Sequence, residues 1–104
     1  GITGLMKVAH AVEGFGLDIE LHGGSIPIQH CMAAIRNTNY LEWGLVHPKI
    51  DTWSPDDLYV KGFQSGLKAI DENGCITVPT GLGLGVELNW NNIDKYKVGS
   101  RTYE

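Results

Sequence analysis

His22 and Glu42 are the two residues whose types and spacing best suit proton chemistry in this chain. Each ends a short stretch with strand-like alternation, and the residues between them can form one crossover helix. Two parallel strands joined by a helix place their C-terminal ends on the same rim of a sheet or barrel. Imidazole titrates near neutral pH, which suits proton transfer in both directions. The sequence therefore predicts that His22 and Glu42 converge on one ligand.

The segment before His22 should be a helix followed by a strand. Apolar side chains fall on one broad arc over residues 3–15, which predicts an amphipathic helix. Residues 17–22 alternate, with Asp18, Glu20 and His22 on one face. That face would meet solvent in an open sheet, but in an α/β barrel it would point into the mouth. Glu20 is then either a support for His22 and a polar substrate or a structural ion-pair partner.

The connection between the two strands should be a helix. Gly23 and Gly24 let the backbone turn sharply after the first strand, and they could also touch a ligand. Residues 25–36 can form a helix that a serine caps, with a proline tolerated in its first turn. Residues 40–43 then form the second strand. Two parallel strands cannot bury both faces or close a barrel, so the unit is expected to be a piece of something larger.

The pattern changes beyond residue 44. Residues 45–60 are typical of a loop punctuated by prolines. Residues 67–79 predict a hairpin, in which Asn73 and Gly74 would supply the positive φ values of a tight turn. The glycine-rich residues 80–90 should close with a strand, and the polar end should be a surface tail. We therefore expect an α/β fold with a β-rich C-terminal tail.

Composition excludes several classes of function. A formal net charge of −4 gives no electrostatic footprint for nucleic acid, and no run of about 18 apolar residues could span a membrane. Cys31 and Cys75 lie far apart and fit a reduced, cytoplasmic setting. Neither cysteine has zinc-ligand spacing with His30 or His47. The glycines at 81, 83 and 85 are not followed by the lysine and Ser/Thr of a phosphate-binding loop.

The order of these motifs resembles the mandelate racemase and muconate lactonizing enzyme family of the enolase superfamily. The resemblance is carried by GITG before a helix, a strand ending in His22, the YLEW segment with Glu42, and the closing VPTGLGLGVELNW. It implies the C-terminal portion of a modified TIM barrel, (β/α)7β. Residues 1–46 would supply helix 6, strand 7, helix 7 and strand 8. Residues 47–104 would form a C-terminal loop and hairpin tail that packs back toward a capping domain.

The resemblance also implies a reaction. Members of the family abstract the proton α to a carboxylate, and Mg²⁺ stabilises the enediolate. We expect an acid-sugar dehydratase-like lyase that then eliminates the β-hydroxyl, with a racemase or epimerase as the alternative. His22 would be the catalytic base or acid, and Glu42, when protonated, would donate a hydrogen bond to the enediolate oxygen. Glu20, Gly23 and Gly24 would contact the substrate.

The family's pattern needs groups that the resemblance places upstream of Gly1. These are the three carboxylate ligands of Mg²⁺, an aspartate that pairs with the histidine, and the capping domain. No metal ligand is therefore expected in these residues, and the isolated chain is expected to be inactive. The implied partners are the rest of the barrel, a small acid-sugar substrate and further copies in a homo-oligomer.

One hypothesis comes from a different class of function. The chain could be a self-standing α+β binding module in which His22 and Glu42 are merely structural. That hypothesis predicts a stable monomer of 104 residues.

Overall fold

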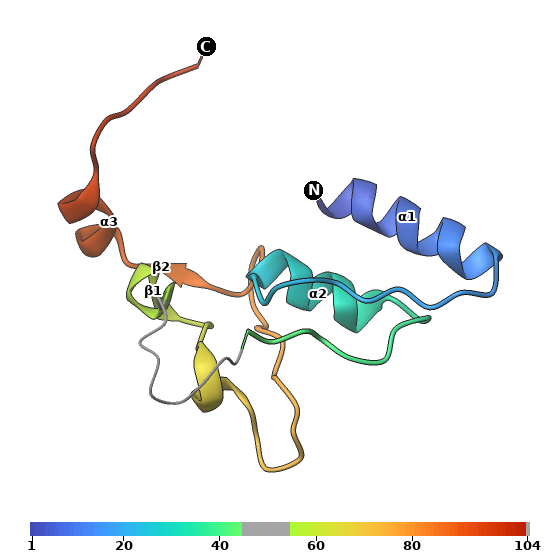
Figure 1. Ribbon diagram of the computed structural model, residues 1–104. Helices are drawn as coiled ribbons and strands as arrows, with labels where there is room; N and C mark the ends of the chain where they lie inside the picture. Colours follow the sequence, from blue (N-terminus) through green and yellow to red (C-terminus); the bar gives the residue numbers. More distant parts are fainter. Residues whose placement is uncertain (45–54, 104) are drawn as a thin grey trace.

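The computed structural model describes residues 1–44 and 55–103 of the chain (Figure 1). Residues 45–54 of the predicted loop, and with them the proposed boundary between residues 46 and 47, lie outside the described residues. Residues 55–60, also expected to be loop, instead form a 3-10 helix and the start of a strand. The helices are α1 (Ile2–Gly14), α2 (Ile26–Ala34) and α3 (Trp90–Tyr96), the 3-10 helices are η1 (Pro55–Leu58) and η2 (Gly66–Ala69), and the strands are β1 (Tyr59–Lys61) and β2 (Glu87–Leu88).

Helix α1 confirms the amphipathic helix expected over residues 3–15. Its end follows from Gly16, which adopts a left-handed φ of 69°. The N–H of Gly16 bonds the Glu13 carbonyl at 2.9 Å, and the N–H of Leu17 bonds the Val12 carbonyl at 3.2 Å. These two bonds form the Schellman motif, which satisfies carbonyls that the helix end would otherwise leave unpaired. The chain can therefore reverse direction directly after the helix.

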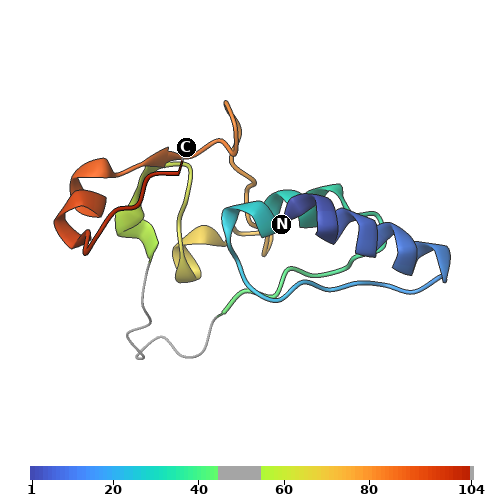
Figure 2. The ribbon, with the colours of Figure 1, turned by 90° about the horizontal axis from the view of Figure 1, so that it is seen from above.

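Helix α2 confirms the crossover helix but is shorter than the predicted 25–36. Ser25 stands at the N-cap with extended backbone, yet its side chain makes no capping hydrogen bond. Helices α1 and α2 run in the same direction, and the extended segments that follow them both run back (Figures 1 and 2). Residues 17–22 and 37–43 therefore lie parallel, as the crossover connection requires.

The predicted strands at 17–22 and 40–43 are extended segments that pair only at isolated points. The Ile19 N–H donates to the Asn37 carbonyl at 2.8 Å, and a parallel bridge joins His22 to Glu42. Between these points the N–H groups of residues 39 and 40 donate to the Glu20 carboxylate and not to backbone carbonyls of the first segment. Side-chain bonds of this kind compete with regular backbone pairing. A full β-ladder was therefore the wrong expectation here.

The hairpin expected over 67–79 is reduced to one antiparallel bridge between Ile70 and Ile76. Its first half is taken by η2. The turn also differs, because Gly74 alone adopts a positive φ, of 76°, and Asn73 does not. The Asp71 carboxylate accepts the Asn73 N–H at 2.9 Å. An Asx-type turn followed by a left-handed glycine therefore replaces the predicted Asn-Gly turn.

The C-terminal half also contains a helix that the sequence analysis missed. Strands β1 and β2 pair antiparallel, and α3 begins directly after them. Asn89 caps this helix, since its side chain accepts the Asn92 N–H at 3.2 Å. The expected β-rich tail is thus a small sheet with a short helix. Residues 97–103 are exposed and have no regular structure, as the polar composition predicted.

The buried core is small and lies between α1, α2 and the extended segments. Its members are Ala9, Leu21, Cys31 and Ile35. The chain exposes 8287 Å², whereas a compact monomer of its mass exposes about 5,800 Å². Its radius of gyration is 16.0 Å, against about 13 Å for a compact domain of this length. The chain therefore leaves a larger surface open than a compact domain of its size.

Large apolar side chains lie on that open surface. Phe15 is 82% and Leu82 is 99% exposed. In the part of the chain that the structure describes, no helix combines the length and the apolar character needed to cross a bilayer.

Candidate active site at the ends of two parallel segments

His22 and Glu42 lie in direct contact at the ends of the two parallel segments. The distance from His22 Nδ1 to Glu42 Oε2 is 2.7 Å. With Glu42 ionised, its carboxylate can only accept, so His22 Nδ1 is the donor in this contact and Nε2 is the second ring nitrogen. Both side chains are open in this chain, at 91% and 59% exposure. The structure thus brings together the pair that the sequence singled out, while their catalytic roles stay predictions.

The loop after His22 is shaped by its two glycines. Gly23 has a φ of 94°, which favours glycine strongly. The Trp43 ring covers Gly24 so closely that an added Cβ would collide with ring carbons. The Gly24 carbonyl accepts the Gln29 amide at 2.8 Å. These contacts show how both glycines shape the loop, and their contact with substrate stays a prediction.

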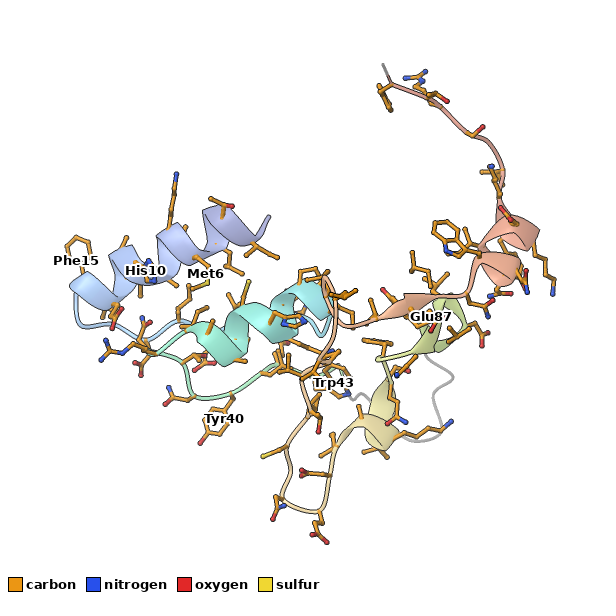
Figure 3. All side chains as sticks on the ribbon, turned by 180° about the vertical axis from the view of Figure 1, so that it is seen from behind. Met6, His10, Phe15, Tyr40, Trp43 and Glu87 are labelled. Carbon is orange, nitrogen blue, oxygen red and sulfur yellow. The ribbon has the colours of Figure 1, made fainter. Side chains whose placement is uncertain are left out.

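Trp43 links this rim to the C-terminal half. Its indole N–H donates to the Gly66 carbonyl at 3.0 Å. Figure 3 shows Trp43 where the segment after α2 meets the later part of the chain, while Tyr40 projects away from it. A ring on the residue after Glu42 therefore packs on the loop after His22, which ties the two segment ends together a second time.

The hydrogen bonds described for Glu20 all run to the neighbouring segment and none to His22, while its contact with substrate stays a prediction. Its two oxygens accept the N–H groups of Asn39 and Tyr40 at 3.0 and 3.1 Å and the Thr38 hydroxyl at 3.1 Å. All of these donors are neutral, so Glu20 is held by hydrogen bonds and the ion-pair interpretation gains no support. The bond from the Tyr40 backbone, with those from Asn39 and Thr38, lowers the pKa of the Glu20 carboxyl.

This pKa direction gives a titration test. The Glu20 carboxyl should titrate below its ordinary range in a ¹³C NMR titration of the complete protein that contains this chain. A depressed folded-state pKa contributes stability above the unfolded-state pKa, and that contribution is lost as the pH falls through the lowered value. The hydrogen bonds to Asn39 and Tyr40 should weaken over the same interval. A Glu20 pKa at or above the ordinary glutamate value would contradict the assignment.

Sequence reasoning missed the residues that hold the two segments together. It gave no role to Asn37 or Asn39, which lie between the predicted helix and the second strand, but the Asn37 amide donates to the Leu17 carbonyl at 2.8 Å. The sequence signal that could have found these contacts is the run of Asn and Thr at residues 37–39, which follows the helix and lies opposite the acidic residues of segment 17–22. His30, set aside as a non-ligand, bonds the Leu84 carbonyl through Nε2 at 3.0 Å. That contact ties α2 to the glycine-rich loop.

The acidic and histidine side chains around His22 and Glu42 do not by themselves form a site for a divalent cation. Within residues 1–44 and 55–103, no group of three His, Cys, Asp or Glu side chains could hold a metal ion. The oxygens of Glu20 already face N–H and O–H donors, and Glu42 Oε2 faces the His22 ring. A cation would have to take its ligands from elsewhere.

Comparison with known families identifies the class of protein. The model of the enolase C-terminal domain-like family matches residues 1–92. The chain therefore belongs to this family, within the enolase superfamily of enzymes, and its α/β structure is a fragment consistent with that membership. Neither a curated protein nor a solved structure matched the chain.

Proposed function

We propose that this chain is the C-terminal part of the catalytic barrel of a mandelate racemase-like enzyme, an acid-sugar dehydratase. The observation that carries the proposal is the 2.7 Å contact between His22 and Glu42, from ends of parallel segments joined by one helix. A rim of this kind is where barrel enzymes gather their reactive groups. Family membership supports the barrel. We further propose that residues 1–46 are its last units and that residues 47–104 form the returning tail.

The chemistry uses the free ring nitrogen of His22. Glu42 holds Nδ1–H, so Nε2 can take the proton α to the substrate carboxylate, and the electron pair of that C–H bond enters the carboxylate as an enediolate. Glu42 Oε1, when protonated, would donate a hydrogen bond to an enediolate oxygen. Collapse of the enediolate then breaks the bond to the β-hydroxyl, which leaves as water with the proton from His22. The substrate is a mono- or dicarboxylic polyhydroxy acid.

The proposal includes partners outside the described residues. Superfamily members generally use Mg²⁺, and we place its ligands on the rest of the barrel because this chain offers no ligand cluster in its described part. The open surface, about 2,500 Å² above that of a compact monomer, fits a chain that packs on further barrel elements and a capping domain. We further propose a cytoplasmic homo-oligomer.

The test is a library of acid sugars incubated with the complete protein and Mg²⁺. Dehydration converts an α,β-dihydroxy acid to a 2-keto acid, which semicarbazide reports by absorbance. We expect one or a few acid sugars to react and the isolated 104-residue chain to be inactive. Inversion at the α-carbon without loss of water would assign the racemase alternative. Dehydration by the isolated chain would refute the proposal.

The isolated chain also separates the enzyme fragment from a self-standing binding module. Light scattering and thermal melting should show association and no cooperative monomeric transition, because the core is small and large apolar side chains are exposed. A cooperative melt of a monomer would instead favour the binding module.

A further inference from the structure

We propose that Glu20 is a positioning residue that fixes the register of the two parallel segments and thereby places Glu42 beside His22. Its catalytic consequence rests on the proposed function, whereas its structural part can be measured separately. The inference replaces a substrate contact by a role inside the protein.

The first support is the saturation of the Glu20 carboxylate. Oε1 accepts the Asn39 N–H at 3.0 Å and the Asn39 side-chain amide at 3.2 Å. Oε2 accepts the Tyr40 N–H and the Thr38 hydroxyl, both at 3.1 Å. A carboxylate has about four acceptor positions, so these bonds fill them. No acceptor position is left over for a substrate hydroxyl.

The second support is that three of the bonds between the segments, spaced along their length, join residues that are 20 positions apart. The Asn37 amide bonds Leu17, and the Tyr40 N–H bonds Glu20, each across 20 residues. His22 and Glu42 are also 20 residues apart. A slip by one residue would turn the side chains of one segment to its opposite face. Glu20 is the middle tie, directly before the reactive pair.

The third support is that the Glu20 carboxylate accepts backbone N–H groups that a regular β-ladder would pair with carbonyls. Backbone pairing occurs at Ile19 with Asn37 and again at the His22–Glu42 bridge. Between these points the N–H groups of Asn39 and Tyr40 have Glu20 as their acceptor. Without the carboxylate, the N–H groups of residues 39 and 40 would lose the acceptor that joins them to the first segment.

Asp18 offers a matched control on the same face. It lies two residues before Glu20 and, among the residues that the structure describes, accepts one bond, from the Asn39 side-chain amide at 3.1 Å. Asp18→Asn removes the same charge from the same segment without touching the backbone bonds of residues 39 and 40. A charge effect would appear in both variants, while a register effect would appear only in Glu20→Gln.

The experiment compares Glu20→Gln with Asp18→Asn in the complete protein, using the acid sugar found in the library screen. Glutamine keeps one acceptor oxygen and can satisfy only part of the donor set. We expect kcat to fall about 10- to 100-fold in Glu20→Gln, since misplacing a reactive group by about 1 Å costs up to about 100-fold. Asp18→Asn should keep the wild-type kcat.

A spectroscopic readout reports the placement of Glu42 directly. In ¹⁵N NMR of the imidazole, wild type and Asp18→Asn should show a protected Nδ1–H at His22, and Glu20→Gln should lose that protection. A raised KM with unchanged kcat and an unchanged His22 signal would overturn the proposal in favour of a substrate contact. Equal losses in both variants would overturn it in favour of a charge effect.

A milder variant guards against a folding failure. Thr38→Val removes one of the bonds to Glu20 and leaves the carboxylate in place. It should weaken the His22 signal and kcat in the same direction as Glu20→Gln, but less. No change in a folded Thr38→Val, combined with an unfolded Glu20→Gln, would count against a positioning role and for a purely global one.

The outcome is separable from that of the proposed function. Were His22→Asn to keep full activity, the proposed function would fail, and the His22 signal in Glu20→Gln would still decide the structural claim. Were His22→Asn inactive while Glu20→Gln matched wild type in activity and spectrum, only the positioning role would fail.

Discussion

His22→Asn in the complete protein should lower kcat for acid-sugar dehydration by about 1,000-fold, within the range of about 100- to 10,000-fold that a positioned acid–base group supplies. Asparagine can still donate a hydrogen bond to Glu42, so the contact between the segments need not be lost, but an amide cannot take up a proton at neutral pH. Steady-state kinetics with the semicarbazide assay measures the effect.

His10 gives the matched control for this prediction. It lies on helix α1, away from the segment ends (Figure 3), and is exposed. His10→Asn makes the same chemical change and should leave kcat and KM at their wild-type values. If His22→Asn retained more than about a tenth of the wild-type kcat, proton transfer by His22 would be excluded as the main contribution to the rate.

The helical half of the fold could be predicted because its signals are local. The apolar arc of α1 and Gly16 at its end specify where the helix runs and stops. The sharp turn at Gly23 and the serine and proline at the start of α2 predict a crossover helix. The contact between His22 and Glu42 could be predicted from these elements, because a crossover helix makes the two segments parallel and brings their ends together.

The C-terminal half was less predictable because its signals conflict. The end of the glycine-rich residues 80–90 indicated a strand, but Asn89 can end a strand and cap a helix at once. The Asn73–Gly74 pair indicated one tight turn, and the Asp71 carboxylate selected another. The local conformation at both places depends on which side chain bonds a backbone N–H, and a hydropathy pattern does not contain that information.

The ties around the candidate site needed three-dimensional structure for a related reason. The bonds from residues 38–40 to Glu20 cross between segments whose register had to be known first. The packing of Trp43 on Gly24 likewise depends on both segment ends being in place. The sequence therefore showed which residues could react, and the structure showed which residues hold them.

The glycine-rich loop before β2 shows the same relation between pattern and structure. Gly81, Gly83 and Gly85 all have positive φ values, so the glycine spacing permits a tight backbone path. At Gly85 a Cβ would lie 2.7 Å from the Pro79 carbonyl carbon, whereas at Gly83 it would meet open space. The two glycines thus share a backbone conformation and differ in surroundings.

Gly85→Ala should therefore destabilise the complete protein by about 3 kcal/mol, from a left-handed alanine and a clash with backbone that cannot move aside. Gly83→Ala carries only the cost of the left-handed conformation, about 1 kcal/mol. Urea unfolding of both variants at equal protein concentration measures the difference. The loop is also bonded to His30 on α2 through Leu84, so Gly85→Ala should loosen α2 in hydrogen exchange while Gly83→Ala does not. Equal losses of stability would mean that Pro79 and Gly85 are not in contact in the complete protein.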